Sequence, residues 1–217
     1  MNSFDLLIFD CDGVVVDSEV IACRCLADIL GRYGAPVDVD ETLDRFLGRS
    51  SSAVREYFLA RTGKPLPDSF HSDLLQQLEQ SFRGSLKLMP HVRAVLDAID
   101  RPYCLASSSD PDRVQMTLAV THLADYFCDR VYTAAMVAHG KPAPDIFLYA
   151  AAQMGVEASG ALVIEDSVNG VLAGKAAGMT VWGFIGGSHY SGRDGARLLS
   201  AAGADRIFGS LAELVAN

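Results

Sequence analysis

The sequence predicts an α/β protein built on a doubly wound parallel sheet, with an all-helical domain inserted after the first strand. Short apolar segments alternate with helical patterns from residue 90 onward, and this alternation is typical of parallel strands connected by helices. Residues 18–83, by contrast, contain helical patterns only. The chain has 217 residues, half of them apolar, which is long enough for one full core and one small inserted domain.

Six segments are predicted to be strands because they are short, apolar and often β-branched. The helical patterns between them would cover both faces of the sheet, which gives a Rossmann-like core. Asp110 is expected to cap one of these helices, with Pro111 at its first position, and Gly178 to end the last one. The predicted strands are Asp5–Phe9, Tyr103–Ala106, Arg130–Thr133, Leu162–Ile164, Thr180–Ile185 and Arg206–Phe208. The predicted core helices are His91–Ile99, Asp112–Val120, Asp145–Met154 and Val168–Ala177.

Four further helices are predicted in the insertion, and in the last of them large apolar residues recur on one face. Asp68 can cap that helix. The predicted helices are Ile21–Tyr33, Glu41–Leu47, Ala53–Arg61 and Ser69–Phe82. We expect a core domain at residues 1–16 plus 86–217 and a helical cap domain at 17–85. Both connections between the core and the inserted helices lie beside the candidate site, so the cap can act as a lid over it. Alternatively, these helices simply pack as one end of the core.

The composition restricts the possible partners. Lysine and arginine number 18 against 27 aspartate and glutamate, so the formal charge is −9, which disfavours binding to nucleic acid and to anionic membranes. No apolar run of about 18 residues suggests a membrane span. The five cysteines lack the spacing of a disulfide framework, and we expect buried or partly buried thiols in a reducing compartment. These features predict a cytoplasmic protein, and we expect a monomer because no long apolar seam demands a partner.

Two carboxylates, Asp10 and Asp12, stand two residues apart directly after the first predicted strand. In an open parallel sheet, ligands bind outside the carboxyl ends of the strands. Gly13 follows at once and lets the backbone turn tightly toward a ligand. One carboxylate can attack while its neighbour moves protons, and the pair offers oxygen ligands to a hard cation such as Mg²⁺. The alternative is an ordinary strand end with a solvated Asp-Gly turn.

Three later segments place polar groups at the ends of further predicted strands. The serines at 107–109 precede a helix N-terminus, where hydroxyl and N–H groups can hold an anion, although helix capping explains the same residues. Lys141 lies in a loop that two prolines stiffen, and a fixed ammonium there could neutralise a phosphoryl group; most lone lysines are solvated. Glu165 and Asp166 end another strand, and adjacent carboxylates repel each other unless a cation or a lysine is near.

In this order, the four segments resemble the motifs of the haloacid dehalogenase-like superfamily of aspartate-nucleophile phosphotransferases. The matching residues are Asp10-Cys11-Asp12-Gly13-Val14, Ser107, Lys141-Pro142-Ala143-Pro144-Asp145 and Glu165-Asp166. The resemblance spans nearly the whole chain, including the helical cap. Asp17-Ser18-Glu19 and the Lys141 loop are similar to the branch that contains β-phosphoglucomutase and sugar-phosphate phosphatases.

The resemblance implies a catalytic role for four residues. Asp10 would attack phosphorus and form an aspartyl-phosphate. Asp12 would protonate the leaving alkoxide and then deprotonate the hydrolytic water. Ser107 and Lys141 would hold the remaining phosphoryl oxygens. These roles suit phosphoryl transfer, which needs in-line positioning and neutralisation of charge.

The resemblance also implies Mg²⁺ as the cofactor. Its ligands would be the carboxylates of Asp10 and Asp166 and the backbone carbonyl of Asp12. Glu165 would bind the ion directly or through water. Mg²⁺ would thereby relieve the repulsion between the adjacent carboxylates.

The cap is expected to supply specificity. The loop Gly48-Arg49-Ser50-Ser51 links two predicted cap helices, and the matching loop of the family faces the catalytic pocket. Arg49 could bind a second anionic group or sugar hydroxyls, although an exposed surface arginine is the usual case. Further candidates for substrate contacts are Ser108, Ser109 and Asn169.

The histidines show no ligand-like spacing, and we expect all five to be structural or on the surface. They are His71, His91, His122, His139 and His189. Only His189, in a glycine-rich loop near a strand end, has a position worth checking against the site.

These observations predict a Mg²⁺-dependent phosphatase acting on a small phosphorylated metabolite, a sugar or sugar-acid phosphate similar to the substrate of 6-phosphogluconate phosphatases. The β-phosphoglucomutase pattern has a histidine five residues after the aspartate that matches Asp17, and this chain has Ala22 there. Hydrolysis is therefore favoured over transfer to a sugar. The alternatives are a phosphomutase acting on a hexose 1-phosphate and a non-catalytic metabolite-binding protein.

Overall fold

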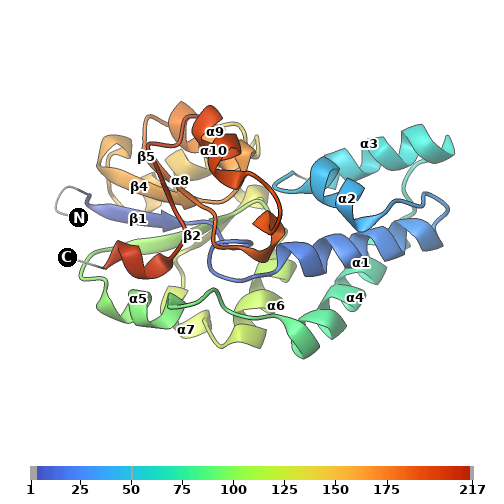
Figure 1. The fold of residues 1–217 in the computed structure, drawn as a ribbon, viewed down its shortest axis with the longest axis horizontal. Coiled ribbons are helices and arrows are strands. Elements are labelled where there is room, and N and C mark those ends of the chain that lie inside the picture. Colours follow the sequence, from blue (N-terminus) through green and yellow to red (C-terminus); the bar gives the residue numbers. More distant parts are fainter. Residues whose placement is uncertain (1–3, 50, 216–217) are drawn as a thin grey trace.

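The computed structural model describes residues 4–49 and 51–215, and its core is one parallel sheet (Figure 1). The strands are β1 (Leu6–Phe9), β2 (Tyr103–Ser107), β3 (Val131–Thr133), β4 (Ala161–Glu165), β5 (Thr180–Phe184) and β6 (Arg206–Phe208). Their order is β3-β2-β1-β4-β5-β6, so the chain changes direction across the sheet at β1. Ligands bind at such a switch point, outside the carboxyl ends of the strands. The predicted α/β fold class is confirmed.

Helices cover both faces of the sheet because successive side chains of a strand point to opposite sides. Leu7 and Phe9 of β1 belong to one buried cluster and Leu6 and Ile8 to another. The first cluster includes residues of α5 (Val92–Ala98), α6 (Pro111–Thr121), α7 (Ala124–Phe127) and η4 (Leu211–Leu214). The second includes residues of α8 (Asp145–Gln153), α9 (Val168–Ala176) and α10 (Gly195–Ala201). Shorter 3-10 turns are η1 (Ala134–Met136), η2 (Ala158–Gly160) and η3 (Ser188–Tyr190).

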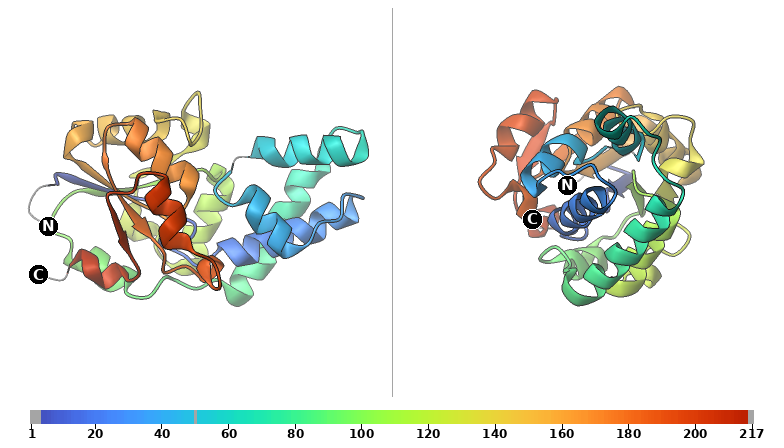
Figure 2. Two further views of the ribbon diagram at one scale, coloured as in Figure 1. Left: turned by 45° about the horizontal axis from the view of Figure 1, so that its top comes forward. Right: turned by 90° about the vertical axis from the view of Figure 1, so that its right-hand side faces the viewer.

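Four helices extend from the end of the sheet at which the switch point lies (Figure 2). They are α1 (Glu19–Arg32), α2 (Val39–Phe46), α3 (Ser51–Thr62) and α4 (Ser69–Ser85). They have a buried cluster of their own, in which Ile29 and Leu30 of α1 pack with Phe58 of α3 and Phe70 of α4. We propose on this basis that residues 17–85 form a cap domain and that residues 1–16 with 86–217 form the core.

The two connections between these parts lie beside each other. Val16 and Leu88 form an isolated antiparallel bridge. The backbone N–H of Met89 donates to the carbonyl of Val15 at 3.0 Å, and that of Asp17 donates to Lys87 at 2.9 Å. The cap is therefore joined to the core through a short, hydrogen-bonded double crossing, next to the carboxyl end of β1.

The structure departs from the sequence-based expectations at several points. Asp68 and Asp110 stand at the N-cap positions of α4 and α6, but neither side chain makes a capping hydrogen bond. The Asp110 carboxylate instead lies 3.9 Å from His71 of the cap. Cys128 is exposed rather than buried. Gly178 has a φ of +74° directly after α9, as expected for a helix-ending glycine. Within the described residues, every helix is too short or too polar to cross a bilayer.

Candidate active site

All of the predicted site residues except Asn169 line one cavity of about 720 Å³ between the core and the cap. The carboxyl ends of β1, β2 and β4 form its floor, because the strands are parallel and adjacent. Residues of α1, α3 and α4 form its walls on the cap side. The predicted site residues that line it are Asp10, Asp12, Arg49, Ser107, Ser108, Ser109, Lys141, Glu165 and Asp166.

Lys141 lines the cavity, and its side chain is only 1% exposed. Its ammonium donates to Asp10 Oδ1 at 2.6 Å, to Glu165 Oε1 at 2.5 Å and to the carbonyl of Ala106 at 3.1 Å. Burial alone would lower the pKa of Lys141, but the charges of Asp10 and Glu165 hold it above its ordinary value. The lysine is therefore a permanent positive charge beside the Asp10 carboxylate.

Asp12 is held by three donors from the core and the cap connection. Its Oδ1 accepts hydrogen bonds from Ser18 at 2.6 Å and from Arg113 at 2.7 Å, and its Oδ2 accepts one from Ser109 at 2.7 Å. Burial alone would raise the pKa of Asp12, but the Arg113 charge and these hydrogen bonds outweigh burial and hold it below the ordinary value. These contacts favour the ionised form of Asp12. Ser109, a candidate for substrate contact, lines the cavity and donates its hydroxyl to Asp12.

Ser107 and Ser108 line the cavity at the end of β2. Ser107 is buried and its hydroxyl accepts a hydrogen bond from the N–H of Ser109 at 3.1 Å. The hydroxyl proton of Ser107 is free to point at a ligand, since a hydroxyl both donates and accepts. The first turn of α6 begins at Pro111 and lines the same cavity, so the helix N-terminus lies near this hydroxyl.

Burial raises the pKa of Asp10 well above its ordinary value, and the nearby charges of Glu165 and Asp166 add to the effect while Lys141 opposes it. Burial likewise raises the pKa of Asp166, whose Oδ2 is buried without a hydrogen-bond partner in the described structure. Asp10, Glu165 and Asp166 share one ammonium, so in their ionised forms the three carboxylates would exceed its charge by two. That excess and the unpartnered oxygen are what a divalent cation would satisfy.

The residues fit Mg²⁺ as an ion that takes only a few of its ligands from the protein. In the described part of the chain, no group of three or more Asp, Glu, His or Cys side chains converges tightly enough to hold an ion alone. Mg²⁺ is typically bound by one or two carboxylates and keeps several waters and substrate phosphate oxygens as its other ligands. Asp10 and Asp166, with the carbonyl of Asp12, suit that arrangement.

Glu165 has a different environment from the one expected of a metal ligand. Its Oε1 accepts from Lys141, and its Oε2 accepts from the backbone N–H and the hydroxyl of Ser167 at 2.9 and 3.0 Å. A Cβ atom at Gly170 would overlap the same carboxylate. Both oxygens of Glu165 therefore already hold partners, and its evident role in the fold is to fix Lys141.

Arg113 and Glu19 were not among the predicted site residues, and His189 was expected to be structural or on the surface. The place of Arg113 in the first turn of α6 is the signal that could have found it, because that helix end faces the site. Glu19 lines the cavity, and burial, with the charges of Asp12 and Asp166, raises its pKa to about 8. His189 is buried with its Nε2 3.1 Å from Asp166 Oδ2.

The cap contributes basic side chains and a contact with the core. Arg49 and Arg55 both line the cavity, and only Arg49 was expected there. Asn169, expected to contact substrate, donates from Nδ2 to the carbonyl of Gly48 at 3.1 Å and so holds the loop that carries Arg49. Ser50 of that loop lies outside the described residues.

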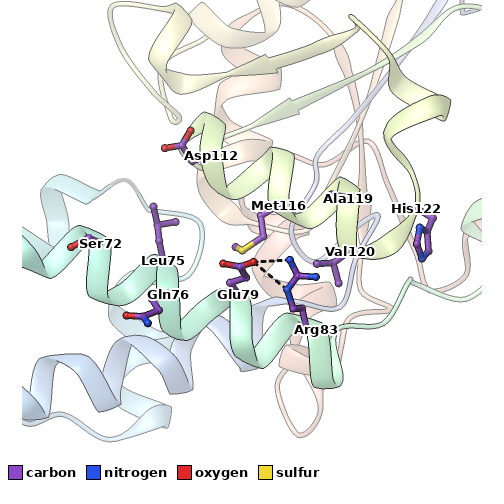
Figure 3. Close-up of a pocket in the computed structure, with 10 residues that line it drawn as sticks. All are labelled: Ser72, Leu75, Gln76, Glu79, Arg83, Asp112, Met116, Ala119, Val120 and His122. Carbon is purple, nitrogen blue, oxygen red and sulfur yellow. Dashed lines mark hydrogen bonds and ion pairs between the residues drawn. The ribbon is translucent and has the colours of Figure 1, made fainter.

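A second hollow, of about 690 Å³, lies between α4 of the cap and α6 of the core (Figure 3). Leu75 and Met116 face each other across it, and Glu79 and Arg83 form an ion pair along its edge (Figure 3). The nucleophile candidates lie in the other cavity, so this groove marks the border between cap and core.

Comparisons with known proteins identify the family and the fold that this chain resembles. A family model described as haloacid dehalogenase-like hydrolase matches residues 4–178. The 6-phosphogluconate phosphatase of Escherichia coli (strain K12) is 27% identical over 190 residues, which are 87% of this chain and 86% of that protein. The fructose-1-phosphate phosphatase of the same strain is 30% identical over 175 residues, 80% of this chain and 92% of that protein.

A solved structure is also similar over nearly the whole chain. It is a HAD family hydrolase from Deinococcus radiodurans R1 with bound phosphate and sodium. It is 33% identical, has a TM-score of 0.75, and the match covers 99% of this chain and 94% of that one.

Proposed function

Because the chain belongs to the haloacid dehalogenase-like hydrolase family, we propose that it is a Mg²⁺-dependent phosphatase that hydrolyses a sugar or sugar-acid phosphate through an aspartyl-phosphate on Asp10. The observation that carries this proposal is the environment of Asp10. One of its oxygens is bound to Lys141, and the other accepts no side-chain hydrogen bond from the described residues. A carboxylate with one anchored and one free oxygen, at the floor of a polar cavity, is placed to act as a nucleophile.

The proposed reaction uses the residues at these positions. The free oxygen of Asp10 attacks phosphorus, the bond from phosphorus to the ester oxygen breaks, and the leaving alkoxide takes a proton from Asp12. The arriving phosphate brings negative charge, which favours the protonated form of Asp12 before this step. Water then gives a proton to the Asp12 carboxylate and attacks the aspartyl-phosphate, which releases inorganic phosphate and restores the Asp10 carboxylate.

Charge neutralisation comes from Lys141, Ser107 and the α6 N-terminus, which together face the phosphoryl oxygens. Asp10, Asp166 and the carbonyl of Asp12 would hold Mg²⁺, which supplies further neutralisation of the phosphoryl oxygens when bound. The similar structure from Deinococcus radiodurans R1 contains bound phosphate and sodium, which supports binding of an anion and a cation by a protein of this fold.

We infer the substrate class from the cap side of the cavity. Arg49 and Arg55 place two guanidinium groups on the cap wall, while Lys141 and Ser107 lie on the core floor. A cavity of about 720 Å³ leaves room for a sugar-sized body between the two ends. Because the protein is acidic overall, two arginines at the far wall favour a substrate with a second anionic group, as in a sugar-acid phosphate. The E. coli 6-phosphogluconate phosphatase supports the same class.

The first test is release of inorganic phosphate from a panel containing 6-phosphogluconate, fructose 1-phosphate, β-glucose 1-phosphate and phosphoglycolate, with Mg²⁺ and with EDTA. We expect release that needs Mg²⁺ and that disappears in Asp10→Asn, whose circular dichroism stays like the wild type. Full activity in folded Asp10→Asn contradicts the proposal. Conversion of β-glucose 1-phosphate to the 6-phosphate without phosphate release would favour a phosphomutase.

The second test addresses the substrate class with a matched pair of arginines on α3. Arg55 lines the cavity, whereas Arg61 is exposed at the other end of the same helix. Arg55→Met is expected to raise the KM for 6-phosphogluconate about tenfold and that for a sugar phosphate without a carboxylate less, because a charge-assisted contact is worth roughly 1.5 kcal/mol. Arg61→Met should leave both unchanged. Equal effects of Arg55→Met on the two substrates would exclude a carboxylate contact.

A further inference from the structure

His189 is completely buried beside the cavity floor, yet both of its ring nitrogens lack a hydrogen bond in the described structure. Its Nε2 lies 3.1 Å from Oδ2 of Asp166, which is also buried and without a hydrogen-bond partner. Buried polar atoms are rarely left unpaired, and when they are, a functional role is a common reason. The reaction described above uses Asp166 but gives His189 nothing to do.

The backbone clears space for this pair from two sides. A Cβ atom at Gly13 would overlap Oδ2 of Asp166 and lie 3.1 Å from Cε1 of His189. A Cβ atom at Gly187 would lie 2.5 Å from Cε1 of His189. The imidazole–carboxylate pair therefore occupies space that side chains at two glycines, in separate segments of the chain, would otherwise fill. One of them, Gly13, belongs to the loop that carries Asp10 and Asp12.

The loop that carries His189 is also anchored at both ends. Before it, the backbone N–H and the hydroxyl of Ser188 donate to Asp17 Oδ1 at 3.0 and 2.7 Å. After it, the hydroxyl of Tyr190 donates to the backbone carbonyl of Asp166. The rings of His189 and Tyr190 lie 4.3 Å apart between their centroids. These contacts fix the position of the His189 imidazole beside Asp166.

We propose that His189 is a positioning residue that donates its Nε2–H to Oδ2 of Asp166 and thereby aims the other carboxylate oxygen at the divalent cation. Hydrogen bonds from outside a metal site orient the ligands and set affinity, and their loss typically weakens metal binding about 10–100-fold. A neutral imidazole carries one N–H, and the proposal places it on Nε2, the ring nitrogen that lies 3.1 Å from Oδ2 of Asp166. This inference rests on the proposed function, since the cation is the one that site requires.

The test is the affinity of the purified, full-length protein for Mg²⁺, measured by isothermal titration calorimetry without substrate. His189→Gln and His189→Met are a matched pair, because both side chains are unbranched and of similar length but only glutamine has an N–H donor. We expect His189→Gln to bind Mg²⁺ within about threefold of the wild type and His189→Met to bind about tenfold more weakly or worse. His139→Met, at a position 75% exposed, should bind like the wild type.

Equal affinities of folded His189→Met and the wild type overturn the inference, and so does a wild type that binds no Mg²⁺. Should His189→Met fail to fold, ¹⁵N NMR of histidine-labelled wild type decides, with the His189 signals assigned by their absence in His189→Gln. A proton on Nε2 in the Mg²⁺ form is expected, and a ring protonated only on Nδ1 overturns the proposal. Metal binding is read without turnover, so a protein that shows the expected affinities but releases no phosphate refutes only the phosphatase proposal.

Discussion

Replacing Lys141 with methionine is expected to destabilise the protein by about 3–5 kcal/mol at pH 8. The ammonium lies 2.6 Å from Asp10 Oδ1 and 2.5 Å from Glu165 Oε1, inside a site where all three side chains are at most 10% exposed. Without Lys141 both carboxylates lose their counter-charge, and removing one partner of a buried ion pair costs this much. Methionine keeps most of the volume against Phe147, so the loss reflects charge rather than a cavity.

The sign of the pH dependence follows from the raised pKa of Asp10. A carboxyl group whose pKa is higher in the folded than in the unfolded state destabilises the fold above the folded-state pKa. That penalty disappears as the pH falls below the unfolded-state value, because both states are then protonated. Loss of Lys141 raises the pKa of Asp10 further, so the difference in the free energy of unfolding between Lys141→Met and the wild type should shrink from pH 8 toward pH 4.

The assay is urea unfolding followed by circular dichroism at both pH values. Lys175→Met is the matched control, because Lys175 pairs with Asp205 at 2.7 Å but is 35% exposed, and such pairs contribute about 0–1 kcal/mol. Lys141→Met should also lower the Tm by about 6–20 °C in a chain of this size. Equal losses in the two variants, or a loss for Lys141→Met that grows as the pH falls, would refute the reasoning.

Three further outcomes are expected. Glu19 has a pKa of about 8 and is therefore only about one-tenth protonated at pH 9, where its negative charge repels the phosphate of the substrate. The KM of the wild type should rise about tenfold between pH 7 and pH 9, and Glu19→Gln should abolish this rise in a steady-state assay. Arg113→Met raises the pKa of Asp12, so the acid limb of kcat against pH should move to higher pH; an unmoved limb contradicts the pairing. Asn169→Ala removes the bond to the Gly48 carbonyl and should raise KM about 3- to 10-fold with little change in kcat, whereas an unchanged KM means that the loop is held without it.

Local patterns were sufficient to predict the sheet and four of the helices that cover it, whereas α7 and α10 were not predicted. The alternation of short apolar segments with helical ones predicted β1 through β6. In the structure, β2 and β4 each end one residue later than predicted, at Ser107 and Glu165. Polar residues directly after strands were predictable as site candidates, because parallel strands place their carboxyl ends along one edge. Asp10 and Asp12 were recognisable on this ground, and Lys141 by the two prolines of its loop.

The partners of those residues could not be predicted in the same way. The adjacent acids Glu165 and Asp166 look alike in the chain, yet Glu165 binds Lys141 and Ser167 while Asp166 faces His189. Arg113 is an ordinary helical arginine until the fold brings it to an aspartate 101 positions earlier.

The order of residues along this chain was enough to establish its architecture and the type of chemistry at one edge of the sheet, since periodicity and strand ends are local properties. Which carboxylate is paired, which is left unpartnered and which histidine lies beside it depend on how distant segments pack. That packing is a collective result of the whole core, and no short stretch of sequence encodes it.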